Sequence, residues 1–222
     1  MDEAADVDPI AEILAALAYG ERAAAARARA NVDLAPDGRA RSQQRMTADR
    51  ERENADLVEA RLEERADPGL IERFRPFFDA FFEHTEPADW LEAQTFHYVG
   101  DALVSDFADA LMPLLDPVSA TVVRSTIADR SAQASFAIDE LGRLMEVDPT
   151  ARDRIAAYAR RIAGEALTQT RRALQQTRVL RSLMGGADEL EKRMVLDLLD
   201  RHRQRLDRLG IESVDEPADE GG

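Results

Sequence analysis

Three of the long helical segments in this sequence begin at an aspartate-proline pair. The pairs are Asp8-Pro9, Asp116-Pro117 and Asp148-Pro149. An aspartate side chain can cap a helix N-terminus, and proline is favoured at the first helical position, so each pair predicts a helix start. Behind each pair, apolar residues recur every three or four positions, and no alternating run indicates a strand. The sequence therefore predicts an all-α fold.

The same reading gives the organisation of the chain. We expect long helices at about residues 9–31, 39–66, 87–111, 116–145, 148–184 and 187–209. Short turns pair the first four, which predicts a four-helix bundle made of two antiparallel hairpins, with the last two helices packed outside. We expect one domain over residues 9–210. The acidic ends, 1–8 and 211–222, are expected to be disordered because they carry few apolar residues.

A short aromatic segment separates the two expected hairpins. The stretch "RFRPFFDAFFEH", residues 73–84, holds five of the eight phenylalanines in the chain. We interpret it as a connector helix that caps one end of the bundle with aromatic side chains. The alternative is a lid or a docking patch, which would require the rings to form one exposed surface.

Composition excludes several classes of function. The 222-residue chain has no cysteine, so disulfides, thiolate metal sites and a cysteine nucleophile are impossible. No run approaches the roughly 20 apolar residues that span a bilayer, and no signal-peptide pattern opens the chain, which favours the cytoplasm and no membrane contact. The net charge of −15 disfavours a large nucleic-acid surface, which needs local positive charge.

Polar side chains interrupt the apolar face of the second helix. In "ADRERENADLVEARL", residues 48–62, Asn54 lies at the centre of that face and Glu51 lies inside its edge. The apolar residues that we take to mark the inward face are Met46, Leu57, Val58 and Leu62. A buried carboxylate and a buried amide both need partners, because an unpaired buried charge costs several kcal/mol.

Two other helices also turn charged residues inward. Glu21 lies at the centre of the apolar stripe of the first helix, and Arg130 lies at the centre of the stripe of the fourth, with Gln133 near its edge. Glu21 and Glu51 are equally distant from Pro36 in the first turn, so an antiparallel hairpin places the two carboxylates level with each other. Two close carboxylates raise each other's pKa or require a cation.

This arrangement resembles the di-iron carboxylate proteins of the ferritin-like superfamily, which use a Glu from each of two helices and a Glu-x-x-His from each of the other two. The segments "LAYGERAAAARARANVDLAP", "DWLEAQTFHYVGDALVSDF" and "RSAQASFAIDEL", with the order of the helices, are similar to one family in it. That family is the actinobacterial branch of the tRNA methylthio-isopentenyl-adenosine hydroxylase-like proteins. The resemblance covers about residues 9–210 and implies a ferritin-like fold and a di-iron oxygenase.

The ligand set implied by the resemblance is incomplete in this sequence. Glu21 matches the first-helix Glu, and Glu51 matches the Glu of the first Glu-x-x-His pair, but Asn54 stands at its His position. The second pair falls on Arg130 and Gln133, so both of its ligands are missing.

The third-helix carboxylate has two candidates. Asp101 is favoured by register because it is level with Arg130 about the intervening turn, whereas Asp106 is favoured by its position nearer the apolar stripe. We expect His97 to be a packing or surface histidine, since Gln94 replaces the Glu of a ligand pair. His84 and His202 are expected in or near exposed stretches.

These substitutions lead to one hypothesis and one alternative. In the hypothesis, the Arg130 guanidinium replaces the lost metals and pairs with Glu21 and Glu51, while Asn54 and Gln133 complete the hydrogen bonds. The protein would then be a non-catalytic, partner-binding or structural module without a cofactor, with a protein partner or a second copy of itself as possible partners.

In the alternative, the protein is a metal-dependent oxygenase that resembles the tRNA-modifying hydroxylases. It would be a non-haem iron hydroxylase or oxidase with tRNA as its partner. Iron or manganese would be held by Glu21, Glu51 and one of Asp101 and Asp106.

Overall fold

A computed structural model describes residues 8–128, 130–176 and 188–211 of the chain. Within these ranges every regular element is a helix, which confirms the all-α prediction. None of the described helices is long and apolar enough to cross a membrane. The termini predicted to be disordered lie outside the described residues, except for Asp8, which caps the first helix, and Ile211, which is buried.

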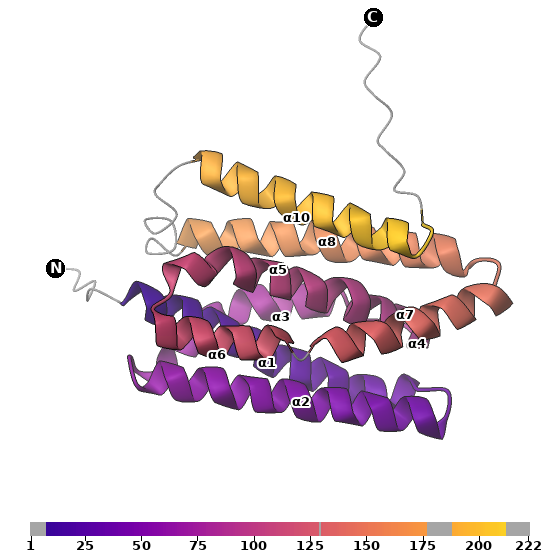
Figure 1. Cartoon of the computed structure of the whole chain (residues 1–222), viewed down its shortest axis with the longest axis horizontal. Coiled ribbons are helices and arrows are strands. Elements are labelled where there is room, and N and C mark those ends of the chain that lie inside the picture. The colour runs from indigo at the N-terminus through magenta and orange to yellow at the C-terminus, as the bar shows by residue number, and fades with distance from the viewer. Residues whose placement is uncertain (1–7, 129, 177–187, 212–222) are drawn as a thin grey trace, which may run out of the picture.

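The first hairpin of the bundle joins α1 (Pro9–Ala30) to α2 (Gly38–Glu63) through the short helix η1 (Asn31–Leu34). The two helices lie side by side along the long axis of the molecule (Figure 1). Asp8 accepts a hydrogen bond from the backbone N–H of Ile10 at 3.0 Å, and Asp37 accepts one from Ala40 at 2.8 Å. These caps satisfy N–H groups that a helix start leaves without intrahelical partners, and this fixes where each helix begins.

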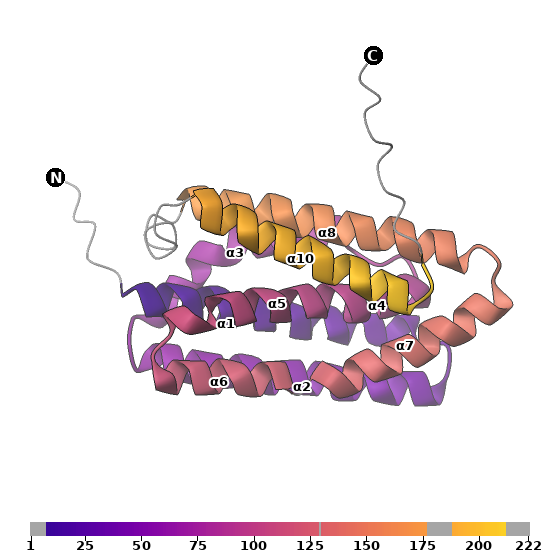
Figure 2. The ribbon, with the colours of Figure 1, turned by 45° about the horizontal axis from the view of Figure 1, so that its top comes forward.

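The other two members of the bundle each comprise more than one described helix. The third consists of α4 (Trp90–Thr95), η3 (Phe96–Gly100) and α5 (Asp101–Leu111). The fourth consists of α6 (Pro117–Ala128) and α7 (Arg130–Val147), which run end to end in both views (Figures 1 and 2). We predicted one continuous third helix, but η3 is a π-helical turn, in which the backbone N–H of Asp101 bonds to the carbonyl of Phe96. Such turns shift the helical register and often accompany functional sites.

The last two helices cover one side of the bundle, as predicted. Helix α8 (Ala151–Gln176) packs against α4, and α10 (Asp188–Arg208) packs against α5 and α8. Gly210 ends α10 with a φ of 67°, a left-handed conformation that favours glycine. The predicted end of the fifth helix at Gly185 and Gly186 lies outside the described residues.

The aromatic segment does not cap an end of the bundle. The turn η2 (Pro68–Phe74) leads into α3 (Arg75–His84), which lies between α1 and α8. Phe74, Phe77 and Phe81 are buried there, whereas Phe78 and Phe82 are half-buried. The expectation of an end cap is therefore wrong. The segment is amphipathic, and its apolar side is buried against α1 and α8 along their length.

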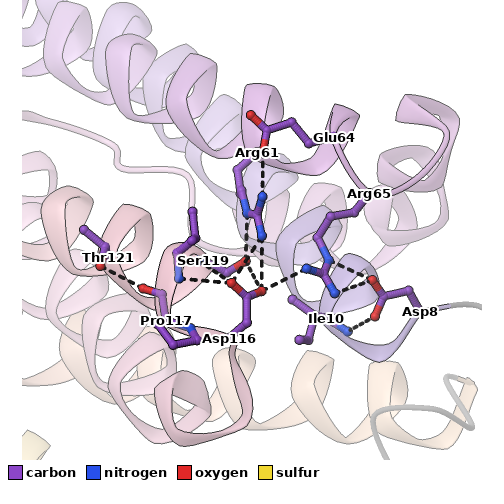
Figure 3. A network of polar contacts seen from close by, with 10 residues as sticks. Asp8, Ile10, Arg61, Glu64, Arg65, Asp116, Pro117, Ser119 and Thr121 are labelled. Atoms are coloured by element: carbon purple, nitrogen blue, oxygen red, sulfur yellow. Dashed lines mark hydrogen bonds and ion pairs between the residues drawn. The ribbon is translucent and has the colours of Figure 1, made fainter.

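A network of ion pairs joins the starts of α1 and α6 to the end of α2 (Figure 3). Arg65 bonds to Asp8 at 2.7 Å and to Asp116 at 2.9 Å. Asp116 also accepts hydrogen bonds from Arg61 at 3.2 Å and from the hydroxyl of Ser119 at 2.7 Å. Hydrogen bonds from Ser119 and Arg61 hold the pKa of Asp116 well below its ordinary value. These side chains hydrogen-bond to one another and connect three helix ends, so we interpret the network as one that stabilises the fold.

Replacing Asp116 with alanine is expected to lower the melting temperature by roughly 2–6 °C, as the loss of a helix cap does in a chain of this size. Because the pKa of Asp116 is lowered, its contribution is present above the ordinary value of 3.8 and decreases as the pH falls below it. Thermal melts of both proteins should therefore converge in acid. The control Asp56→Ala removes an exposed partner of Arg52 and should leave the melting temperature unchanged.

Candidate functional site: a buried arginine-glutamate cluster

The buried face of α2 differs in part from the predicted one. Met46 is 61% exposed and Leu57 is 50% exposed, so both predictions are wrong, whereas Val58 and Leu62 are buried. The inward stripe follows a helical period and is mainly small or polar: Ala40, Gln44, Thr47, Glu51, Asn54, Val58 and Leu62. Hydrophobicity misled the assignment of Met46 and Leu57 because polar residues occupy the true inward positions.

Three of the predicted site residues meet inside the bundle. Arg130, at the start of α7, places Nη2 at 2.6 Å from Oε1 of Glu21 on α1 and at 3.5 Å from Oε2 of Glu51 on α2. All three side chains are at most 9% exposed. A guanidinium is planar and always charged, so it can donate to two carboxyl groups at once. We call these three residues the arginine-glutamate cluster.

Burial and charge change the ionisation of the cluster. Burial raises the pKa of Glu21 to about 8, with Arg130 opposing the shift and the charge of Glu51 adding to it. Burial alone would lower the pKa of Arg130, but the carboxylates of Glu21, Glu51 and Asp101 outweigh it and raise that pKa. Glu21 therefore holds a proton more tightly than an exposed glutamate does, while Arg130 keeps its positive charge.

The remaining contacts of the cluster are weaker than we predicted. Arg130 also donates from Nη1 to the Ser105 hydroxyl at 3.1 Å. Asn54 does not bond to the carboxylates but donates to the backbone carbonyl of Thr126 at 3.5 Å. In the described part of the chain, Oε1 of Gln133 has no hydrogen-bond partner, and neither do Oε2 of Glu21 and Oε1 of Glu51.

Asp101 and His97 form a second polar group beside the cluster. Both are buried, and Nδ1 of His97 lies 2.9 Å from Oδ2 of Asp101. The other ring nitrogen, Nε2, lies 2.8 Å from Nε2 of Gln44, which also donates to the carbonyl of Ala28. An amide nitrogen can only donate, so Nε2 of His97 accepts and Nδ1 carries the proton. Protein groups therefore occupy both nitrogens of His97.

Asp106 is oriented away from the cluster. Its carboxylate pairs with Arg201 at 3.0 Å and with Arg205 at 2.6 Å, both on α10. Of the two candidate aspartates, Asp101 is therefore the one whose charge acts on Arg130. The sequence could not decide between Asp101 and Asp106. The position of α10, whose arginines pair with Asp106, depends on how the helices pack in the folded protein.

The structure also shows buried polar residues that our sequence analysis missed. Glu140 accepts hydrogen bonds from Trp90 Nε1 at 3.1 Å and from Arg143 at 2.8 Å, and it joins α7 to α4. It lies one turn beyond the apolar residues Phe136 and Ala137, so the helical period could have identified it.

The two remaining histidines differ in exposure. His202 is buried, contrary to the prediction, whereas His84 is exposed and pairs with Glu165 at 2.9 Å.

The donor set does not fit two metal ions. Among the described residues, no three His, Cys, Asp or Glu side chains are arranged to hold a metal. The positive guanidinium of Arg130 lies against both glutamates. His97 donates and accepts within the protein, and Asp106 on α5 is paired with arginines of α10. A cation at the cluster would therefore have to displace Arg130.

The fold and this site define an all-α bundle whose four central helices enclose charged side chains. Residues 6–187 match the family described as the ferritin-like domain of actinomycetes. The chain belongs to this family, which confirms the predicted ferritin-like fold. No curated protein matches the sequence.

Proposed function

We propose that this protein is a non-catalytic member of the ferritin-like superfamily, in which Arg130 replaces metal ions as the internal cation. The observation that carries the proposal is the 2.6 Å contact between Arg130 Nη2 and Glu21 Oε1 inside the bundle. The fixed positive charge of Arg130 lies against both glutamates, so the carboxyl pair has a cation without iron. The bundle would then act through its surfaces or cavities, as a structural or partner-binding module.

A second candidate function is favoured by the unsatisfied oxygens. Within the described residues, Oε2 of Glu21 and Oε1 of Glu51 are buried without a hydrogen-bond partner, and buried carboxylate oxygens normally have one. In this alternative, Arg130 moves aside and the glutamates bind iron or manganese, with Asp101 as a further ligand. The protein would be an oxygenase that resembles the tRNA-modifying hydroxylases.

Metal analysis of protein produced in iron- and manganese-supplemented medium distinguishes the non-catalytic module from the metal-dependent oxygenase. We expect the wild-type protein to carry well below one ion per chain. The variant Asn54→His/Arg130→Glu/Gln133→His restores both Glu-x-x-His pairs, and we expect it to bind at least one ion per chain.

The matched control adds Glu51→Gln to that variant and should lose the metal. Stoichiometric iron or manganese in the wild-type protein, removed by Glu21→Gln, would support the oxygenase instead. A restored variant that folds, as judged by circular dichroism, yet binds no more metal than the wild type would mean that these positions are not former ligand positions.

A further inference from the structure

An apolar pocket lies outside the arginine-glutamate cluster, between α1, α3, α5 and α8. Its volume is about 160 Å³. Five phenylalanines and several aliphatic side chains form the wall: Ala16, Leu17, Phe74, Phe77, Phe78, Phe81, Leu103, Val104, Phe107, Leu111, Ala166 and Ala173, with Gly100, Gln169 and Thr170. Nothing in the proposed function uses this space.

The polar residues of the wall offer little to a polar ligand. Gln169 is buried, and its amide donates to Glu165 at 2.6 Å and accepts from Arg172 at 2.9 Å, both on its own helix. Its hydrogen-bonding capacity is thus largely used within α8. Thr170, the other polar side chain of the wall, is half-buried. A water molecule inside would find few of the two to four polar partners that it needs.

The aromatic part of the wall is held in place by α1. The ring of Phe78 rests directly on the backbone at Gly20, where a Cβ atom would lie only 3.0 Å from Cε1 of Phe78. The ring of Tyr19 lies against it as well, at a centroid separation of 5.7 Å. Phe78 therefore does not fold into the pocket, and the space between α3 and α8 is preformed rather than filled by side chains of the wall.

We infer that this pocket is a binding site for a small uncharged molecule with an aromatic ring. Its volume is close to that of an engineered apolar cavity of about 150 Å³ that binds benzene, although this pocket is partly open to solvent. An apolar ligand would gain dispersion contacts that the wall lacks, and phenylalanine rings favour edge and offset contacts with another ring. A charged ligand would lose its hydration without compensation.

The site is separate from the arginine-glutamate cluster. Helix α5 lies between them, since Leu103, Val104 and Phe107 face the pocket while Ser105 bonds to Arg130. Binding in the pocket therefore requires neither a metal nor the pairing of Arg130, and its test is independent of the test of the proposed function.

The test is binding of benzene to the purified full-length protein, measured as a saturable rise in melting temperature. Ala166→Leu places extra side-chain atoms in the pocket and is expected to weaken benzene binding at least tenfold. The matched control is Ala157→Leu, the same change at an exposed position of the same helix, which should bind benzene like the wild type. Benzoate, which adds a charge to the same ring, should not raise the melting temperature.

A complementary variant tests the proposal if Ala166→Leu does not fold. Phe78→Ala enlarges the pocket and should bind naphthalene at least tenfold more tightly than the wild type does. Absence of saturable benzene binding would overturn the inference, as would equal binding by Ala166→Leu and Ala157→Leu. Equal shifts with benzoate and benzene would overturn the assignment to an uncharged ligand.

Discussion

Replacing Arg130 with leucine is expected to lower the free energy of unfolding by about 3–5 kcal/mol, the usual cost of removing one partner of a buried ion pair. The leucine would fill part of the space that the Arg130 side chain occupies. It would leave the negative charge of Glu21 and Glu51 without a cation. Glu21 and Glu51 are both almost fully buried, so water cannot replace the guanidinium without rearrangement. Urea unfolding at pH 7 measures the loss.

Two further variants separate charge from packing. Arg203→Leu removes an exposed arginine that pairs with Asp200 on α10, and it should change stability by less than about 0.5 kcal/mol. The double variant Arg130→Leu/Glu51→Gln removes the unpaired charge and should recover part of the loss. A cost below about 0.5 kcal/mol for Arg130→Leu would mean that the charge in the bundle is compensated by something other than Arg130.

The stability of the wild-type protein is expected to fall as the pH rises from about 5 to about 8. Glu21 binds a proton more tightly in the folded state, where its pKa is about 8, than at its ordinary value of 4.5. A group with a raised pKa contributes its full stability below the unfolded value and loses that contribution as the pH rises through the folded value. For one titrating group the slope is at most about 1.4 kcal/mol per pH unit.

The comparison with Glu21→Gln isolates this effect. Glutamine resembles the protonated carboxyl group at every pH, so the variant should lack the decline between pH 5 and 8. His202 acts in the opposite direction, because burial and Arg205 lower its pKa. Both proteins carry His202, so its contribution cancels in the difference between their urea unfolding curves. Parallel pH profiles for the two proteins would show that Glu21 does not titrate in this range.

The sequence predicted only part of the arginine-glutamate cluster and its surroundings. The helical period placed Glu21, Glu51 and Arg130 on inward faces, and the hairpin register placed the two glutamates level with each other. The partner of Asn54 and one of the two partners of His97 could not be obtained this way, because they lie on other helices. His97 bonds to Gln44 on α2, and the π-helical turn that carries it changes the faces of the third helix.

The sequence by itself determined the helical class, the helix starts at Asp8 and Asp116, and the end at Gly210. These are local effects, since a cap or a left-handed glycine depends on only a few neighbouring residues. The tertiary structure alone decided that Asp106 joins α10, that α3 lies between α1 and α8, and that an apolar pocket remains there. These outcomes depend on the relative positions of whole helices, which no periodicity within a single helix can specify.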